Sequence, residues 1–384
     1  MDKFFDIRPY SDDEVIDVIN RIINDDEFVS AITRLRFPVA ASFLKPILAP
    51  FIRMAVRKQV KGVNSVRTFQ MKVEKYFLHM LETTTTDFTV SGFENVATAG
   101  PCSFISNHRD IVLDPAVVNY ALHINNLDTV RIAIGDNLLT KDFATDLMRI
   151  NKSFIVKRSA KGPRELFGAL KHLSAYINHS IKEDQHSIWI AQREGRAKDG
   201  LDKTDPAILK MLTLDNRKIP FAEAVDSLNI VPCSVSYEYD PCDQMKAREL
   251  HSIATTGSYT KEEHEDVHSI ASGITGQKGR IHLSFGEPLT GTFEDADEVA
   301  AYLDKQIIGL YALHPTNYFA YAMLHGKEAE GVYGSHGEIY SPADLQSERN
   351  AFEKYIGDVP EALRDYVLAS YANPIISKMK FGFL

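Results

Sequence analysis

His108 stands in a polar cluster, SNHRD, directly after the short apolar run Ser103–Ile105, which has the pattern of a buried strand. Polar side chains cannot lie in a protein core without partners, so the cluster is expected where the strand ends. Asp114-Pro115 follows, with the residue types of a helix N-cap and first helical position, and predicts a helix over residues 116–123. A histidine between a strand end and a helix start, with a carboxylate a few residues on, can act as an oriented general base.

The same residues also have a structural explanation. The chain holds 13 histidines, and a single histidine near an aspartate is more often structural than catalytic. Capping of the predicted helix explains Asp114 by itself. Taken in isolation, the cluster therefore leaves a catalytic and a structural interpretation open.

The segment SNHRDIVLD resembles the first signature block of the glycerolipid acyltransferase superfamily, which comprises the glycerol-3-phosphate and lysophosphatidic acid acyltransferases. In that block four residues separate a histidine from an aspartate, whereas five residues separate His108 from Asp114. The resemblance implies that His108 is the catalytic base and that Asp114, which precedes the predicted helix, orients it. Asp110, two residues from His108, is the alternative orienting acid.

Two further segments follow in the order of the family. NKSFIVKRSAKGPREL resembles a strand that ends in basic residues, and the resemblance implies that Lys157 and Arg158 contact the phosphate of the acceptor. SIWIAQREGRAKDGL resembles the Pro-Glu-Gly-Thr-Arg block without its proline, which implies an acceptor-binding role for Glu194, Gly195 and Arg196. Considered alone, Lys157 and Arg158 are equally well explained as solvent-exposed cations at a strand end.

A fourth segment, NIVPCSVSYEYDP, resembles a strand that is typical of the glycerol-3-phosphate branch and helps to shape the acyl-donor side. KGRIHLSFGEPL also resembles a later strand of that branch. Alone, the fourth segment is explained as a core strand with an edge proline. Together the blocks span residues 102–290 and place the resemblance closest to the glycerol-3-phosphate branch.

The resemblance implies an O-acyltransferase that moves a fatty acyl group from acyl-CoA or acyl carrier protein to glycerol-3-phosphate in phospholipid synthesis, without a metal or redox cofactor. A lysophospholipid such as lysophosphatidic acid, or an amino-acid-derived lipid, is the alternative acceptor. Two alternatives belong to other classes. One is a metal-dependent hydrolase with His108 and Asp110 as a His-x-Asp ligand pair. The other is a non-catalytic protein of lipid surfaces.

Positioning these residues requires alternating strands and helices. Six strands are predicted, at residues 102–106, 130–135, 153–157, 187–191, 230–237 and 280–285, with helical segments between them. This alternation is typical of an α/β fold, here with a mixed, largely parallel sheet flanked by helices, an N-terminal helical subdomain and a helical C-terminal extension. The predicted domains are a helical, basic membrane-surface subdomain over 1–90, an α/β acyltransferase domain over 91–290 and a helical extension over 291–384.

The N-terminal part combines a strong helix signal with a basic segment. Ser11–Glu14 fits a capping box, and apolar residues at helical spacing follow it: Val15, Val18, Ile19, Ile22 and Ile23. Residues 28–73 contain no Asp or Glu and nine Lys or Arg. Residues 34–67 are therefore predicted to lie on a membrane surface, apolar side chains toward lipid and cations toward anionic headgroups. The alternative is a helical subdomain that packs those apolar side chains into its own core.

The composition of the chain bears on its binding partners and on its cellular compartment. A formal net charge of −9 gives no support for nucleic-acid binding. Three cysteines without paired spacing fit a reducing compartment. The first residues lack the pattern of a signal peptide, and no apolar run is long enough to span a bilayer. We therefore expect a cytoplasmic protein that associates peripherally with the inner face of the membrane.

Overall fold

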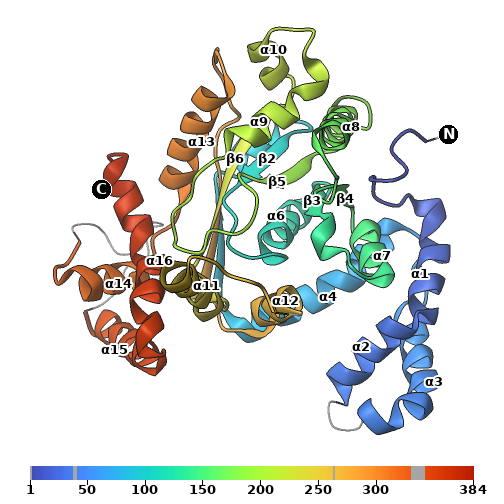
Figure 1. Ribbon diagram of the computed structural model, residues 1–384, viewed down its shortest axis with the longest axis horizontal. Helices are drawn as coiled ribbons and strands as arrows, with labels where there is room; N and C mark the ends of the chain where they lie inside the picture. The colour runs from blue at the N-terminus through green and yellow to red at the C-terminus, as the bar shows by residue number, and fades with distance from the viewer. Residues whose placement is uncertain (1, 38–40, 263, 330–341) are drawn as a thin grey trace. The chain divides into compact units, whose positions relative to one another are not determined.

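The computed structural model describes residues 2–37, 41–262, 264–329 and 342–384. It confirms the predicted fold class, because parallel and antiparallel strand pairs are flanked by helices (Figure 1). The chain divides into two compact units. Unit 1 comprises Met1–His79 and Val130–Tyr176, and unit 2 comprises Met80–Thr129 and Ile177–Leu384.

Unit 1 begins with the predicted N-terminal helix. The carboxylate of Glu14 accepts a hydrogen bond from the backbone N–H of Ser11 at 2.8 Å, which completes the capping box before helix α1 (Val15–Asn24). All five predicted apolar residues of α1 are buried, in a cluster with Ile52 and Ile150. The predicted helix and its buried face are thus confirmed.

The other elements of unit 1 are helical except for one strand pair. The helices are α2 (Asp26–Arg36), α3 (Ala41–Gln59) and α7 (Asp142–Ile150), with the short turns η1 (Asp12–Glu14) and η2 (Asp136–Leu138). Strands β3 (Arg131–Gly135) and β4 (Ser153–Val156) pair in parallel. Helices α4 (Val66–Thr84) and α8 (Pro163–Lys182) contain residues of both units.

The strands of unit 2 follow the order β1-β7-β6-β2-β5. They are β1 (Thr85–Ser91), β2 (Ser103–Ser106), β5 (Ile188–Ala191), β6 (Ile230–Tyr237) and β7 (Gly279–Phe285). β2 runs parallel to β5 and β6, β1 runs parallel to β7, and only the β6–β7 pair is antiparallel within this set of described strands. Ser106 lies opposite both Ala191 and Cys233, so residues that follow β2 and β5 emerge at the same edge.

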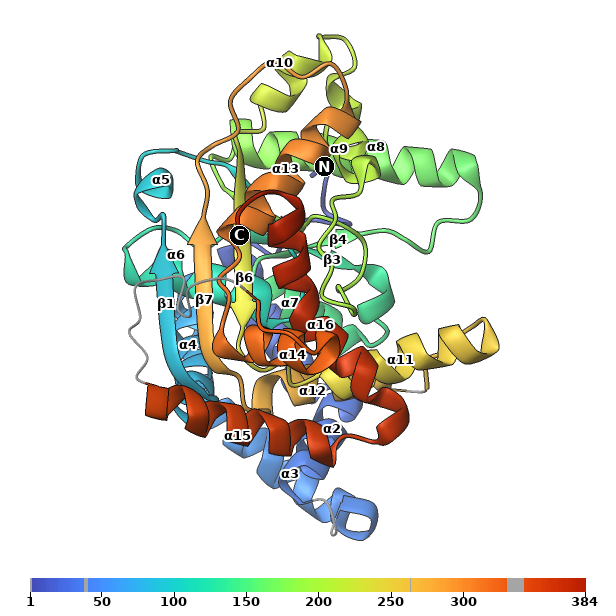
Figure 2. The same cartoon turned by 90° about the vertical axis from the view of Figure 1, so that its left-hand side faces the viewer.

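The helices of unit 2 include the predicted C-terminal ones. They are α5 (Glu94–Ala97), α6 (Leu113–Ile124), α9 (Pro206–Leu212), α10 (Phe221–Asp226), α11 (Asp243–Thr256), α12 (Glu265–Thr275), α13 (Ala296–Leu310), α14 (Pro315–His325), α15 (Pro342–Asp358) and α16 (Glu361–Lys380), with the turn η3 (Leu214–Asn216). Helices α14, α15 and α16 share one apolar core, around Phe319, Phe352 and Tyr371 (Figure 2).

Two local expectations are corrected. Residues 85–90, expected to be helical, belong to strand β1, which pairs with β7. Helix α6 begins at Leu113 with Val112 at its N-cap, so Asp114 lies in the first turn and is not the cap. The capping function falls to Asp110, whose Oδ1 accepts hydrogen bonds from the backbone N–H groups of Val112 and Leu113, both at 2.9 Å.

Candidate active site

Asn107 fixes the chain directly after strand β2. Its side-chain Nδ2 donates to the carbonyl of Val235 at 2.9 Å, and its Oδ1 accepts from the N–H of Val235 at 2.8 Å. The amide side chain thus pairs with β6 as a further strand residue would, and it is fully buried. This two-sided pairing sets the position at which His108 leaves the sheet.

His108 and Asp114 form a close pair. The Nδ1 of His108 lies 2.8 Å from Oδ2 of Asp114, whose side chain is fully buried. The same oxygen accepts hydrogen bonds from the N–H groups of Arg109, at 2.7 Å, and Asp110, at 3.0 Å. The other carboxylate oxygen accepts from the hydroxyl of Tyr237 at 2.8 Å. Four donors therefore hold the carboxylate in one orientation relative to the imidazole.

The second ring nitrogen of His108 is available for chemistry. A carboxylate accepts and does not donate, so Nδ1 carries the proton and Nε2 is left as an acceptor. Nε2 receives no hydrogen bond from the described residues, and the His108 side chain is 15% exposed. The ring also meets Trp189 edge-on, with ring centroids 5.8 Å apart. This arrangement is that of an oriented general base.

Asp110, the alternative orienting acid, has a different environment. It contacts the helix start of α6, and the structure brings Asp114 to His108 instead. Burial raises the pKa of Asp110, and the neighbouring charge of Asp114 raises it further. The backbone of Gly273 in α12 packs against this carboxylate so closely that an added Cβ would lie 2.2 Å from Asp110 Oδ2.

The metal-site alternative requires a cluster of ligands. Among the described residues, no group of three or more His, Cys, Asp or Glu side chains is arranged to hold a metal ion. His108 turns its Nδ1 to Asp114, and Asp110 turns to backbone N–H groups, so the proposed His-x-Asp pair does not converge. Within the described part of the chain, His108 and Asp110 are therefore not placed as joint ligands of one ion.

The third predicted segment meets the loop of His108. The N–H of Gln192 donates to the carbonyl of Ser106, and the N–H of Ala197 donates to the carbonyl of His108, both at 2.8 Å. Glu194 and Gly195, between these two bonds, are exposed, and Gly195 has a φ of 74°, in the left-handed region. The structure thus brings the Glu194–Arg196 segment next to His108.

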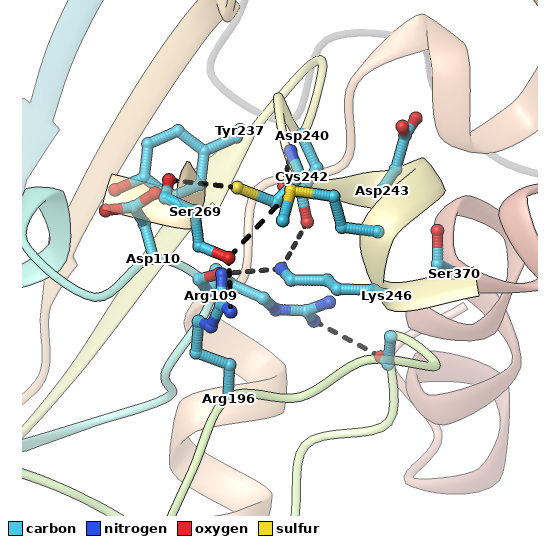
Figure 3. Close-up of polar contacts among 12 residues, drawn as sticks. Arg109, Asp110, Arg196, Tyr237, Asp240, Cys242, Asp243, Lys246, Ser269 and Ser370 are labelled. Atoms are coloured by element: carbon cyan, nitrogen blue, oxygen red, sulfur yellow. Dashed lines mark hydrogen bonds and ion pairs between the residues drawn. The ribbon is translucent and has the colours of Figure 1, made fainter. Parts of the chain in front are cut away.

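Arg196 is only partly paired. Its Nη2 donates to Ser269 Oγ at 3.2 Å, from α12 (Figure 3). Its Nη1 is buried and has no hydrogen-bond partner among the described residues. Ser269 therefore holds Nη2 of the guanidinium, and Nη1 can still donate a hydrogen bond.

Lys157 and Arg158 belong to unit 1. Lys157 Nζ lies 2.5 Å from Asp6 Oδ2, and the backbone N–H of Arg158 donates to Asp136 at 3.0 Å. Lys157 also lines a cavity of about 400 Å³, together with Asp6 and His172. The phosphate-binding role of Lys157 and Arg158 stays a prediction.

The sequence interpretation missed two buried cations that hold the His108 loop. Arg109 Nη2 pairs with Asp202 Oδ2 at 2.6 Å and donates to the carbonyl of Gly200 at 3.2 Å. Lys246 Nζ donates to the carbonyl of Arg109 at 2.6 Å and pairs with Asp240, as Figure 3 shows. Burial disfavours each cation, and its carboxylate partner, Asp202 for Arg109 and Asp240 for Lys246, compensates for this cost.

Helix α16 supports the segment that follows Arg196. Asn373 Nδ2 donates to the carbonyl of Asp199 at 2.7 Å. Gly200, with a φ of 77°, packs against the backbone of Ser370 so closely that an added Cβ would lie 2.2 Å from the Ser370 carbonyl oxygen. The third segment is thus held between the His108 loop and the C-terminal helix.

Tyr237 and Trp189 were also missed as neighbours of the pair. Tyr237 is the last residue of β6, where a polar side chain ends a fully buried strand. Trp189, the only tryptophan of the chain, is a buried residue of β5 whose Nε1 donates to Ser106 Oγ at 3.0 Å. The only sequence feature that could have pointed to Tyr237 is its hydroxyl at the end of a predicted strand.

Part of the chain is similar to known proteins. Residues 87–213 match the model of the Acyltransferase family, which supports the placement of this segment in the acyltransferase superfamily. The match includes both segments that meet at His108. Among solved structures, the chain is similar to the 1-acyl-sn-glycerophosphate (LPA) acyltransferase PlsC from Thermotoga maritima, with a TM-score of 0.40 and 14% identity, over 74% of this chain and 95% of that chain. No curated protein matches the chain.

Proposed function

We propose that this protein is a glycerolipid O-acyltransferase that transfers a fatty acyl group from acyl-CoA or acyl carrier protein to the hydroxyl of glycerol-3-phosphate. The observation that carries the proposal is the contact of His108 Nδ1 with the buried Asp114 at 2.8 Å, in a segment that matches the acyltransferase family. No metal or redox cofactor is required by this chemistry.

In the proposed reaction, His108 Nε2 takes the proton of the acceptor hydroxyl as its oxygen attacks the thioester carbonyl. A C–O bond forms, and the resulting tetrahedral intermediate collapses with cleavage of the C–S bond. The departing thiolate takes the proton back from His108, so the base is regenerated. Asp114 fixes the imidazole and stabilises the imidazolium, as the aspartate of a catalytic triad does.

Basic residues are proposed to bind the phosphate of the acceptor. Arg196 is the first candidate, because its segment adjoins His108 and its Nη1 has no partner among the described residues. Glu194 and Gly195 belong to the same segment, and Glu194 is proposed to bind an acceptor hydroxyl. Lys157 and Arg158 are proposed as further phosphate ligands, on the resemblance of their segment alone. Lysophosphatidic acid, another lysophospholipid or an amino-acid-derived lipid is the alternative acceptor.

Membrane association is proposed through residues 34–67. Residues 38–40 of this segment lie outside the described residues. On α3, Ile47, Phe51 and Met54 are 63%, 60% and 62% exposed and recur at helical spacing, so they share one face. Ile52 of the same helix is buried, so only part of the apolar content packs into the core of unit 1. Among the described helices, none is long and apolar enough to cross a membrane.

Replacement of His108 tests the proposal. We expect His108→Ala to lower the rate of acyl transfer by about 10²- to 10⁴-fold, because the base is removed. The assay offers a labelled acyl thioester with glycerol-3-phosphate, lysophosphatidic acid and an amino-acid-derived lipid in turn, which also identifies the acceptor. His123→Ala, in the last turn of α6, is the matched control. A folded His108→Ala protein with an undiminished rate would overturn the proposed function.

A further inference from the structure

Tyr237 is the only described residue that donates to Oδ1 of Asp114. The other oxygen, Oδ2, has three donors: the His108 ring and two backbone N–H groups of its own loop. The Tyr237 hydroxyl reaches Oδ1 at 2.8 Å from the end of β6, and both side chains are buried. The two oxygens are thus held from opposite sides, by the loop and by the sheet.

This contact fixes an angle that the loop alone does not fix. A carboxylate held at one oxygen only can still pivot about that oxygen when its χ1 and χ2 angles change together, and the pivot changes the direction from which Oδ2 meets His108. The Tyr237 hydroxyl anchors the second oxygen to β6, which is paired with β2 and β7. The orientation of the imidazole is thereby tied to the sheet.

Tyr237 is a permanent donor in this position. Burial raises the pKa of its phenol well above the usual value, and the carboxylates of Asp114, Asp110 and Asp240 raise it further. The hydroxyl therefore stays protonated at neutral pH. It can only donate to Asp114, since an ionised carboxylate offers no proton in return.

The two buried cations beside the pair have carboxylate partners of their own. Arg109 pairs with Asp202, and Lys246 pairs with Asp240. Asp110 is engaged with the start of α6, and burial raises its pKa. The Tyr237 hydroxyl is therefore the neighbouring group whose removal changes the Asp114–His108 pair directly.

We propose that Tyr237 is a positioning residue for acyl transfer, which holds Asp114 so that His108 keeps its catalytic orientation. This inference rests on the proposed function of His108 as a general base. In this role Tyr237 contacts neither substrate and acts only through Asp114.

Tyr237→Phe removes the hydroxyl and keeps the ring. We expect kcat to fall about tenfold, as for loss of one hydrogen bond to a charged group, with little change in KM for either substrate. We also expect the acid limb of the kcat/KM profile to move to higher pH. Asp114 loses a donor that disperses its charge, so it stabilises the imidazolium form of His108 more strongly.

Two further measurements keep the test decisive. Tyr239→Phe is the matched control, because Tyr239 packs against Phe352 and Tyr355 and has no contact with Asp114. Incorporation of 3-fluorotyrosine at position 237 gives a stronger donor of nearly the same shape, and should move the acid limb to lower pH. This second variant covers the case in which Tyr237→Phe fails to fold.

The outcomes separate the two proposals. If His108→Ala is inactive and both Tyr237 variants show the wild-type pH profile, the positioning role is overturned while the acyltransferase proposal stands. If His108→Ala is fully active, the proposed function fails, whatever the Tyr237 variants do. Opposite shifts of the acid limb in the two Tyr237 variants, with Tyr239→Phe unchanged, support the inference.

Discussion

Asp110 and Asp114 lie four residues apart, one before helix α6 and one in its first turn, and they accept different hydrogen bonds. Asp114 accepts from the His108 ring, whereas Asp110 accepts from the backbone N–H groups that open α6. The two carboxylates therefore have separable functions, one toward the candidate base and one toward the helix.

Asparagine at each position tests this separation. Asp114→Asn should lower the rate of acyl transfer by about 10²- to 10⁴-fold, because the amide neither stabilises an imidazolium nor fixes the same tautomer. Asp110→Asn should stay within a few-fold of wild type, because the amide oxygen still accepts from the backbone of α6. Steady-state rates and circular dichroism of both variants provide the measurement. An inactive, folded Asp110→Asn together with an active Asp114→Asn would reverse the assignment.

The exposed apolar face of α3 predicts membrane binding. Replacement of Ile47, Phe51 and Met54 by serine should lower the fraction bound to anionic vesicles at least about tenfold, because about 0.8 kcal/mol is lost for each buried CH₂ group. Cosedimentation with vesicles measures this fraction. Ile16→Ser, at a residue of α1 that is 55% exposed, is the control. Equal binding of the triple variant and the wild type would remove this face from the membrane proposal.

Gly200 and Gly195 provide a matched pair for the support of the third segment. Both have a positive φ, so alanine costs about 1–2 kcal/mol at either position. Only at Gly200 would the new Cβ meet the backbone of Ser370, which should add about 1–3 kcal/mol. We therefore expect Gly200→Ala to unfold at a clearly lower denaturant concentration than Gly195→Ala. Equal midpoints would show that α16 yields to the added methyl group.

Asp243 predicts a pH dependence of stability. It is buried, accepts hydrogen bonds from the hydroxyls of Tyr355 and Tyr371, and burial raises its pKa to about 6. At this residue the folded state binds a proton more tightly than the unfolded state, so the contribution of Asp243 to the free energy of unfolding falls as the pH rises from about 4 to about 6.

Asp243→Asn should remove this dependence, since an amide oxygen accepts the same two hydroxyls without a charge. The difference in unfolding free energy, variant minus wild type, should increase by up to about 3 kcal/mol between pH 4 and pH 7. Urea unfolding at several pH values measures it. A difference that is constant with pH would contradict the prediction.

Most of the sheet could be predicted because its strands are buried apolar runs. The predicted bounds of β6 are those of the structure, and β2 and β5 differ by a single residue at one end. Strand β1 was missed because it lies at the end of the strand order in unit 2, so its Thr-rich sequence is half exposed and lacks an apolar run.

The site was predictable only where its partners are close in sequence. The contact of His108 with Asp114 spans six residues and was among the two expected possibilities. The path of the loop, which separates the functions of Asp110 and Asp114, is set by tertiary hydrogen bonds that spacing does not reveal. Tyr237 is 123 residues from Asp114, and no periodicity or motif connects the two.

The bond from Asn373 to the carbonyl of Asp199 also bears on how the protein is made. As the chain leaves the ribosome, the strands on either side of β2 are complete once residue 237 has emerged, whereas the segment beside His108 gains its last support only with residue 373. Because chains begin to fold during their synthesis, a nascent chain would hold β2, β5 and β6 before this support. The ability to bind substrate should therefore appear late in translation.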